Sequence, residues 1–156
     1  MCPLKLPKMD KKEIKQALQE ENICRIAFID DKFPYISPFQ YVYLDDILYF
    51  HFTDYGKKKK ILEKNKNVCV SIEHLDKDLD SFYFISMQGK LALVENEDEK
   101  LKVFKQIVNN ARKIYSQNFL TAHGFEKEKG WDVLADKNQI LYKFIEINKP
   151  IGLKSP

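Results

Sequence analysis

A run of four lysines, Lys57 to Lys60, is the strongest local charge feature of the chain. It follows Gly56 and opens a segment of good helix formers, so the lysines fall in the first turn of an expected helix. Positive charge there opposes the helix dipole, whereas the free amides at that end favour a bound anion. The run therefore indicates either a phosphate site or a solvated helix face. Lys57 and Lys58 are the candidates for phosphate binding, because four consecutive lysines cannot all face one ligand.

Three histidines, His51, His74 and His123, are candidates for acid-base chemistry. None has the HExxH or CxxC neighbours of a metal site, and no Ser-His-Asp arrangement stands out, so we predict no metal site. His51 is the best candidate for a catalytic residue, because it lies in the aromatic strand end YFHF shortly before the lysine run. A hydrogen-bonded structural role is the alternative for each of the three.

These residues lie in a predicted β-hairpin that leads into a helix. Two aromatic-rich runs meet at Asp45-Asp46, and alternation in the second run puts His51 on one face and Phe52 on the other. In the first run, Pro34 and Pro38 predict an edge strand or a bulge near Pro38. Such interruptions leave backbone groups free for a ligand.

The rest of the pattern predicts a mainly β domain with helices. Strands are expected at residues 23–29, 35–44, 47–52, 67–74, 82–94 and 139–147, and helices at 10–21, 57–65 and 96–115. Residues 116–138 have no sustained period and are expected to form an irregular segment packed on the body. Because the strands mostly follow one another without intervening helices, we expect an α+β fold built on an antiparallel β-barrel.

Two strands carry further predictions. The run ICRIAFI at residues 23–29 is almost wholly apolar, which is typical of a strand buried on both faces. Gly89 lies inside the run at 82–94 and predicts a bulge or a tight corner of the barrel.

Bulk composition favours one cytoplasmic domain over residues 1–156. The net charge of +3, from 26 basic and 23 acidic residues, makes nucleic-acid binding a weak alternative. Three cysteines without CxxC spacing are typical of reduced thiols. No apolar run reaches the length of a membrane span or resembles a signal peptide. We therefore expect neither a nucleic-acid partner nor a membrane association.

The hairpin and its flanks also resemble a known family. The order of a helix, then CRIAFIDDKFPYISPFQYVYLDDILYFHFTDYGKKKKILEKNKNVCV, then FYFISMQGKLALVENEDEKLKVF, is similar to the pyridoxamine phosphate oxidase-like FMN-binding split barrels. Within them it is most similar to the branch that includes the nitroimidazole-resistance proteins. The resemblance covers about residues 10 to 108 and, more loosely, the final strand.

This resemblance implies a six-stranded antiparallel split β-barrel that forms a homodimer, with FMN in a groove at the dimer interface. It implies that the backbone of Pro38, Phe39, Gln40 and Tyr41 lines the flavin ring, that His51 and Phe52 flank it, and that Lys57 and Lys58 hold the phosphate.

The leading functional hypothesis is an FMN-dependent oxidoreductase that reduces a small planar acceptor such as a nitroaromatic, a quinone or a flavin, with NAD(P)H as a candidate donor. The alternative is a non-catalytic protein that binds flavin, deazaflavin or haem on the same fold. Turnover of an acceptor by flavin-loaded protein would discriminate between the two.

Overall fold

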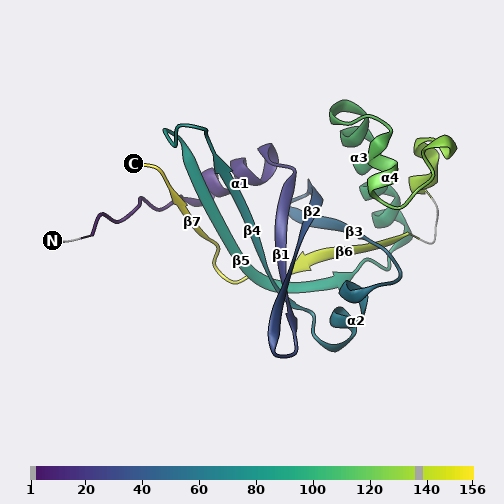
Figure 1. Ribbon diagram of the computed structural model, residues 1–156, viewed down its shortest axis with the longest axis horizontal. Helices are drawn as coiled ribbons and strands as arrows, with labels where there is room; N and C mark the ends of the chain where they lie inside the picture. The colour runs from purple at the N-terminus through teal and green to yellow at the C-terminus, as the bar shows by residue number, and fades with distance from the viewer. Residues whose placement is uncertain (1–2, 136–138) are drawn as a thin grey trace.

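The computed structural model describes residues 3–135 and 139–156. Its strands are β1 (Ile23–Asp30), β2 (Phe33–Leu44), β3 (Ile47–Phe52), β4 (Asn67–Leu75), β5 (Phe82–Leu93), β6 (Ile140–Ile145) and β7 (Ile151–Lys154). Neighbouring strands follow the order β4-β1-β2-β3-β6-β5, and an additional β4–β5 pairing closes the ring. Every pairing is antiparallel. The predicted six-stranded antiparallel split barrel of an α+β protein is thereby confirmed (Figure 1).

The C-terminal tail adds β7, which the sequence did not predict. β7 pairs with the first part of β5, outside the closed ring, and Met9 donates a backbone hydrogen bond to the Gly152 carbonyl at 2.8 Å. The strand has only four residues and follows Pro150 directly. It is therefore too short to show the alternation of apolar and polar residues that indicates a strand in a sequence. The two ends of the chain are thus held side by side (Figure 1).

The helices are α1 (Lys11–Glu20), α2 (Lys57–Lys64), α3 (Glu97–Ile114) and α4 (Asn118–Ala122). The predicted cap of α1 is present, because Asp10 and Glu13 exchange side-chain to backbone hydrogen bonds as a capping box. Asn96 likewise caps α3 by accepting from the Glu99 amide at 2.8 Å. In Figure 1, α3 and α4 lie together above β3 and β6, whereas α2 lies below these strands and follows the Phe52 end of β3.

Residues 116–135 are more regular than predicted. They contain α4 and two 3-10 helices, η1 (Lys127–Lys129) and η2 (Trp131–Ala135). Phe119, Leu120 and Leu134 are buried there against Ala111 of α3. The segment is therefore packed on the body, as expected; residues 136–138 of the predicted irregular stretch lie outside the described residues.

The main core fills the barrel with inward-facing side chains of its strands. Ile26 and Phe28 of β1, Phe50 of β3 and Leu91 of β5 are fully buried, and Ile14, Ala17 and Leu18 of α1 close one end. The hairpin turn at Asp45 and Asp46 has φ of 51° and 63°, which is the left-handed pair that a two-residue turn between twisted strands requires. This turn sets the β2–β3 register on which the candidate site depends.

β1 and β2 each differ from the prediction. β1 buries only one face, since its alternate residues Ile23, Arg25 and Ile29 are exposed. β2 lies between two strands and keeps its register with β1 through Pro34 and Pro38, so the predicted bulge is wrong. However, residues 33–40 pair only with β1, and β3 pairs only with residues 41–44. The first two thirds of β2 is thus an edge on its other side, which is where its prolines are tolerated.

Gly89 marks a tight corner and not a bulge. The β4–β5 register runs through it without interruption, so no residue is inserted. A Cβ at this position would lie 2.7 Å from both the Ile145 carbonyl oxygen and the Phe144 ring. Only glycine lets β5 pass this closely under β6.

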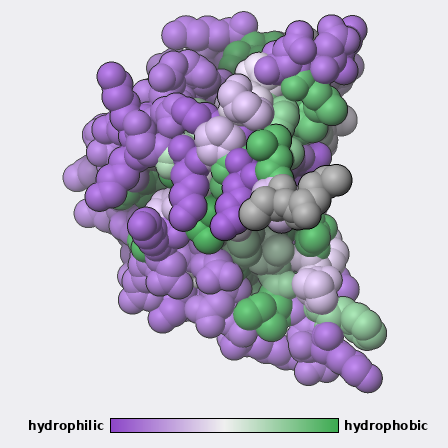
Figure 2. Space-filling model, turned by 90° about the vertical axis from the view of Figure 1, so that its left-hand side faces the viewer, coloured by the Kyte–Doolittle hydropathy of each residue, from purple (hydrophilic) through white to green (hydrophobic). Residues whose placement is uncertain are grey.

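Figure 2 shows the face on which the N-terminal segment lies. It is mostly hydrophilic, and its hydrophobic side chains form small groups separated by hydrophilic ones. No helix in the described part of the chain is long and apolar enough to cross a membrane.

Candidate functional site

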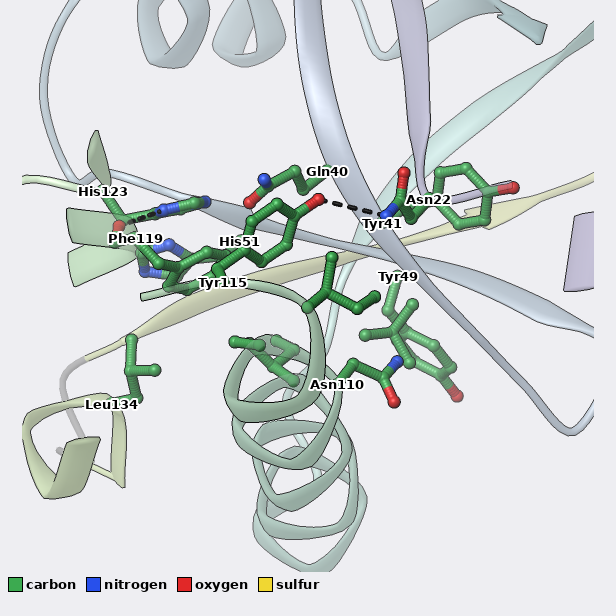
Figure 3. Close-up of a pocket in the computed structure, with 14 residues that line it drawn as sticks. Asn22, Gln40, Tyr41, Tyr49, His51, Asn110, Tyr115, Phe119, His123 and Leu134 are labelled. Atoms are coloured by element: carbon green, nitrogen blue, oxygen red, sulfur yellow. Dashed lines mark hydrogen bonds between the residues drawn. The ribbon is translucent and has the colours of Figure 1, made fainter. Parts of the chain in front are cut away.

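A pocket lies between the outer face of the β2–β3 hairpin and the α3–α4 region (Figure 3). Its enclosed volume is about 60 Å³, and this rises to about 550 Å³ when the open solvent at its mouth is counted. One wall comes from β2 and β3 and the other from residues 107–134; the lining comprises Asn22, Gln40, Tyr41, Val42, Tyr49, His51, Ile107, Asn110, Ala111, Ile114, Tyr115, Phe119, His123 and Leu134. The pocket therefore joins the predicted hairpin to a segment for which the sequence predicted no role.

Strand alternation brings Gln40 and His51 into this pocket together. Tyr41 pairs with Phe50 and both point into the barrel, so the neighbours Gln40 and His51 point outward on adjacent strands. The turn at Asp45-Asp46 fixes this register. Two of the predicted site residues are thus brought to one place.

His51 is held as a neutral ring. Its Nε2 lies 2.6 Å from the Gln139 Oε1, and because an amide oxygen only accepts, the Nε2–H donates. Burial lowers the pKa of His51, and His123 nearby lowers it further, while the bond to Gln139 acts in the opposite sense. The tautomer that donates from Nε2 leaves Nδ1 as an acceptor.

His123 approaches His51 from α4. The two ring centroids are 6.1 Å apart, and Phe125 stacks on His51 at 5.7 Å. The His123 Nδ1–H donates to the Phe119 carbonyl at 2.8 Å, which leaves its Nε2 as an acceptor. Burial also lowers the pKa of His123. The pocket thus contains two imidazoles that are both neutral near pH 7.

The remaining polar groups of the pocket are amides and a phenol. Asn22 donates through Nδ2 to the Tyr115 hydroxyl at 3.1 Å, which leaves the tyrosine proton free to donate. Asn110 Oδ1 accepts from Gln106 at 2.8 Å, so the Asn110 amide protons remain available. Gln40 Oε1 is buried and has no hydrogen-bond partner among the described residues. A buried oxygen of this kind lowers the stability of the fold unless a ligand or a water molecule donates a hydrogen bond to it.

Lys57 and Lys58 lie at the start of α2, with Lys57 beside the first part of β2 and Lys58 nearer to the pocket residue Gln40. Lys57 pairs with Asp30 at 2.9 Å and its ammonium lies 4.8 Å from the centre of the Tyr35 ring. Lys58 lies 5.3 Å from the centre of the Phe39 ring. The helix cap is Gly56, with φ of 92° and no side chain to satisfy the amides that follow. Cationic groups and free amides therefore meet there, as an anion site requires.

The predicted site residues separate into three groups. Gln40 and His51 line the pocket together with Tyr41, and Lys57 and Lys58 lie at the α2 start. Pro38 is exposed on the outer face of β2, and the side chains of Phe39, Tyr41 and Phe52 belong to the barrel core. The Tyr41 hydroxyl donates to the Leu18 carbonyl at 3.0 Å inside that core. A cofactor contact from Phe39 or Phe52 would therefore come from the backbone.

Sequence reasoning missed the second wall of the pocket. Asn22, Asn110 and Tyr115, which come from the β1 start and α3, were not predicted, and His123 from the end of α4 was named as a candidate without a place in the site. Nothing in their local spacing marks them, since α4 is only five residues long. The sequence did show a high aromatic content in the stretch after α3. That content does not indicate which part of the barrel the stretch covers. Among residues 3–135 and 139–156, no cluster of His, Cys, Asp or Glu is arranged to hold a metal ion.

Solved structures of low sequence identity share this fold. An FAD-binding protein of Mesorhizobium loti matches at 15% identity and a TM-score of 0.70, over 98% of this chain and all of the other. A candidate 5-nitroimidazole antibiotic resistance protein of Bacteroides thetaiotaomicron matches at 22% identity and a TM-score of 0.65, over 96% and 87%. The heme storage protein HutZ of Vibrio cholerae matches at 16% identity and a TM-score of 0.62, over 92% and 94%. These likenesses concern the fold.

The sequence itself gives a family. Comparison with curated proteins finds no significant match. The family described as pyridoxamine 5'-phosphate oxidase, however, matches residues 10–129, which include α1, the β1–β5 strands, α3 and the His123 side of the pocket. With the closed split barrel and the pocket on its β2–β3 face, this match places the chain in the pyridoxamine 5'-phosphate oxidase family.

Proposed function

We propose that this protein binds FMN and acts as a cytoplasmic oxidoreductase on a small planar acceptor. The observation that carries the proposal is the arrangement at the two ends of the unpaired part of β2. One end carries a neutral, aromatic-lined pocket, the other carries Lys57 and the open start of α2, and Lys58 lies between them over Phe39. A flavin mononucleotide has the same two parts, a flat uncharged ring and an anionic tail.

The span between the two ends suits such a ligand. Tyr35 lies under Lys57 and Gln40 lines the pocket, and five residues of strand cover about 17 Å. Tyr35 and Gln40 point to opposite sides of β2, so a ligand that reached both ends would pass across the unpaired edge at residues 33–40. That edge offers backbone N–H and C=O groups to the polar edge of a flavin ring.

The phosphate end favours FMN among the flavins. Lys57 and Lys58 provide charge for a single terminal phosphate, with the uncapped amides of α2 as further donors. Lys59 is engaged elsewhere, because it pairs with Asp54 at 2.6 Å. The FAD-binding neighbour supports a flavin in general, and the short lysine cluster supports the mononucleotide.

A bound flavin would supply the hydride or electron transfer, with NAD(P)H as the candidate donor. The chain's own residues would bind the flavin, orient it and shield it from water. Gln139 fixes the tautomer of His51, and α4 with Phe125 covers that ring and limits the access of water. His51 is the proposed catalytic residue, acting as a neutral hydrogen-bonding group and not as a cationic acid.

We further propose that the protein is a homodimer, with a second copy on the outer face of β1, β2 and β5. Ile23, Ile29, Ile36 and Phe84 lie on that face and are 41% to 61% exposed. Exposed apolar residues gathered on one sheet face are typical of an interface. Cys24 and Cys69 are free thiols, which supports the cytoplasm as the compartment.

The competing function is cofactor binding without turnover. It is favoured by the likeness to a heme storage protein and by the pair of neutral imidazoles, since an unprotonated imidazole nitrogen can also hold a haem iron. The two candidates predict different spectra and different activities, so one set of assays separates them.

The test begins with the absorption spectrum of the purified protein and of protein mixed with FMN. FMN-loaded protein is then assayed for NAD(P)H-dependent reduction of nitroaromatics, quinones and free flavins. The oxidoreductase proposal expects flavin bands and reduction of at least one acceptor class. Bound FMN without reduction would support the binding protein, and a protein that takes haem but no flavin would overturn the proposal.

A further inference from the structure

A second cavity lies at the end of the barrel that α1 closes. It is a groove between α1, the last part of β2 and the start of β7, and Figure 1 shows β7 beside α1. Its lining comes from residues 8–18, from Tyr43 and from residues 149–152. None of these residues belongs to the proposed flavin site. The groove is therefore a separate place on the molecule.

The groove has the size and the floor of a small-molecule site. It measures about 640 Å³, whereas sites for small molecules typically measure about 300–1,000 Å³. Ile14 and Leu18 of α1 form its floor as part of the barrel core, and Tyr43 packs against the same core. Ile151 lines the groove from β7 and is 62% exposed. An apolar chain laid in the groove would cover apolar surface that now faces water.

Three lysines without acidic partners also line the groove. Lys8 comes from the N-terminal segment, Lys11 from the first turn of α1 and Lys149 from the connection between β6 and β7. Within the described part of the chain, none of the three forms an ion pair. Like charges that come together from separate segments repel one another, and a bound anion would relieve this repulsion.

The other charged side chains of the groove offset only part of this charge. Lys15 is paired with Asp46 at 2.8 Å, and Asp46 also accepts from the Tyr43 hydroxyl at 3.2 Å. Asp10 is the one acidic residue in the described lining, and its carboxylate accepts from the Glu13 amide at 2.8 Å as the cap of α1. The groove thus combines a net positive charge with an apolar floor.

We propose that this groove binds an amphipathic carboxylate, a molecule of the fatty-acid class with one anionic head group and an apolar body. The head group would lie at Lys8, Lys11 and Lys149, and the body would lie along the floor. An apolar floor alone would favour a neutral molecule, and exposed lysines alone would bind an anion only weakly. The inference goes beyond the proposed function, because it holds whether or not the protein binds a flavin.

The experiment compares two probes that differ only in the head group. Decanoate carries a carboxylate, which is ionised at neutral pH, and decanol carries a hydroxyl on the same chain. Calorimetric titration is expected to show about tenfold tighter binding of decanoate, because only its head group pairs with the lysines. The general hydrophobic preference runs the other way, since decanol is less polar. Equal affinities, tighter binding of decanol, or no binding of decanoate would overturn the proposal.

A double variant locates the head group. Lys11→Ala with Lys149→Ala removes two of the three unpaired lysines, so the preference for decanoate should fall to about twofold. Lys12→Ala with Lys105→Ala removes the same charge from α1 and α3 outside the groove, and this matched control should retain the tenfold preference. All four positions are exposed, so both variants are expected to fold. Retention of the preference in the first variant, or equal losses in the two, would refute the site.

A third variant tests the apolar floor. Ile151→Ser should weaken the binding of both probes by a similar factor and leave the ratio of their affinities unchanged, because it removes contacts to the chain that they share. Leu101→Ser, at an exposed position of α3, is the matched control and should change neither affinity. Unchanged binding of both probes to Ile151→Ser would show that the apolar body does not lie in this groove.

FMN separates the groove from the flavin pocket. Decanoate should bind equally well before and after saturation with FMN, since the two sites share no residue. Displacement of decanoate by FMN would overturn the proposed groove site and leave the proposed function standing. A protein that binds no FMN but prefers decanoate to decanol would support the groove site and overturn the proposed function.

Discussion

The two ends of the unpaired part of β2 differ in their charge and in their burial. At the pocket end, Gln40 and His51 lie between packed layers without any ionic side chain beside them. At the α2 end, Lys57 and Lys58 are close to the surface, and Lys57 already has an acidic partner in Asp30. One end therefore recognises shape and hydrogen-bonding pattern, and the other recognises charge. A ligand that needs both must be flat at one end and anionic at the other.

This difference has a structural cause. The pocket exists only because residues from α3 and α4 cover the outer face of the hairpin, so it depends on packing between distant segments. The lysine end arises locally, from a glycine cap and the turn that follows it. Changes to packing should therefore damage the pocket end, and changes to charge should damage the other.

The largest effect is expected from Leu120→Ala. Leu120 is fully buried in the small cluster under α4, so its truncation leaves a cavity and should lower the free energy of unfolding by about 2–5 kcal/mol. Leu101→Ala, on the exposed side of α3, is the matched control and should change it little. Urea titration measures both. In the folded variant, binding of riboflavin, which carries the ring without the phosphate, should weaken while the preference for FMN over riboflavin persists; loss of that preference instead would contradict the separation of the two ends.

The second effect is expected from replacing Lys57 and Lys58 together by alanine. Removal of two cationic contacts to a phosphate should weaken FMN binding by about 100-fold. Lys59→Ala with Lys60→Ala removes the same charge from the same helix and should leave FMN affinity within about threefold, since exposed charges act weakly at a distance. Fluorescence titration gives both values. Similar losses of FMN affinity in the two double variants would show that the lysines act only through the overall positive potential of α2, and not through direct contacts to the phosphate.

The smallest effect is a difference in pH dependence between two histidines. The pKa of His51 is lowered by burial, so below pH 6.5 the unfolded chain takes up the proton first and the folded state loses stability. The pKa of His74 is raised by its hydrogen bonds to Asp76 and Glu21, so its contribution is present at low pH and is lost as pH rises above 6.5 through its folded value.

Unfolding free energies at pH 5.5 and pH 7.5 test this contrast. Relative to the unaltered protein, His51→Gln should lose less stability on acidification and His74→Gln should lose more. Both shifts are expected to be small beside the two preceding effects. A shift of the same sign in both variants would mean that the two histidines do not differ in the way described.

The part of the site that is local in sequence was predictable. Alternation in β3 separated His51 from Phe52, the turn residues Asp45-Asp46 set the register, and the lysine run identified the α2 start. The closed barrel also followed from consecutive strands, and the capping box of α1 from Asp10 and Glu13.

What escaped prediction depends on contacts between distant segments. His123 was a candidate, but its position was not predicted: it caps the C-terminal end of a five-residue helix that has no recognisable period, and it approaches His51 because α4 packs back on the hairpin. β7 is too short to be recognised and forms because β5 offers it an edge. β1 was predicted to be buried on both faces because its residues are almost all apolar. Apolar residues indicate burial, but they do not show whether the barrel core or another surface covers them.

The most direct test of the account is a pair of fluorescence titrations, one with FMN and one with riboflavin. The two ligands share the ring that the pocket end would receive and differ only in the phosphate that Lys57 and Lys58 would hold. The account predicts quenching by both, with FMN binding about 100-fold more tightly. Absence of quenching, or equal affinity for the two, would contradict a flavin held at both ends of β2.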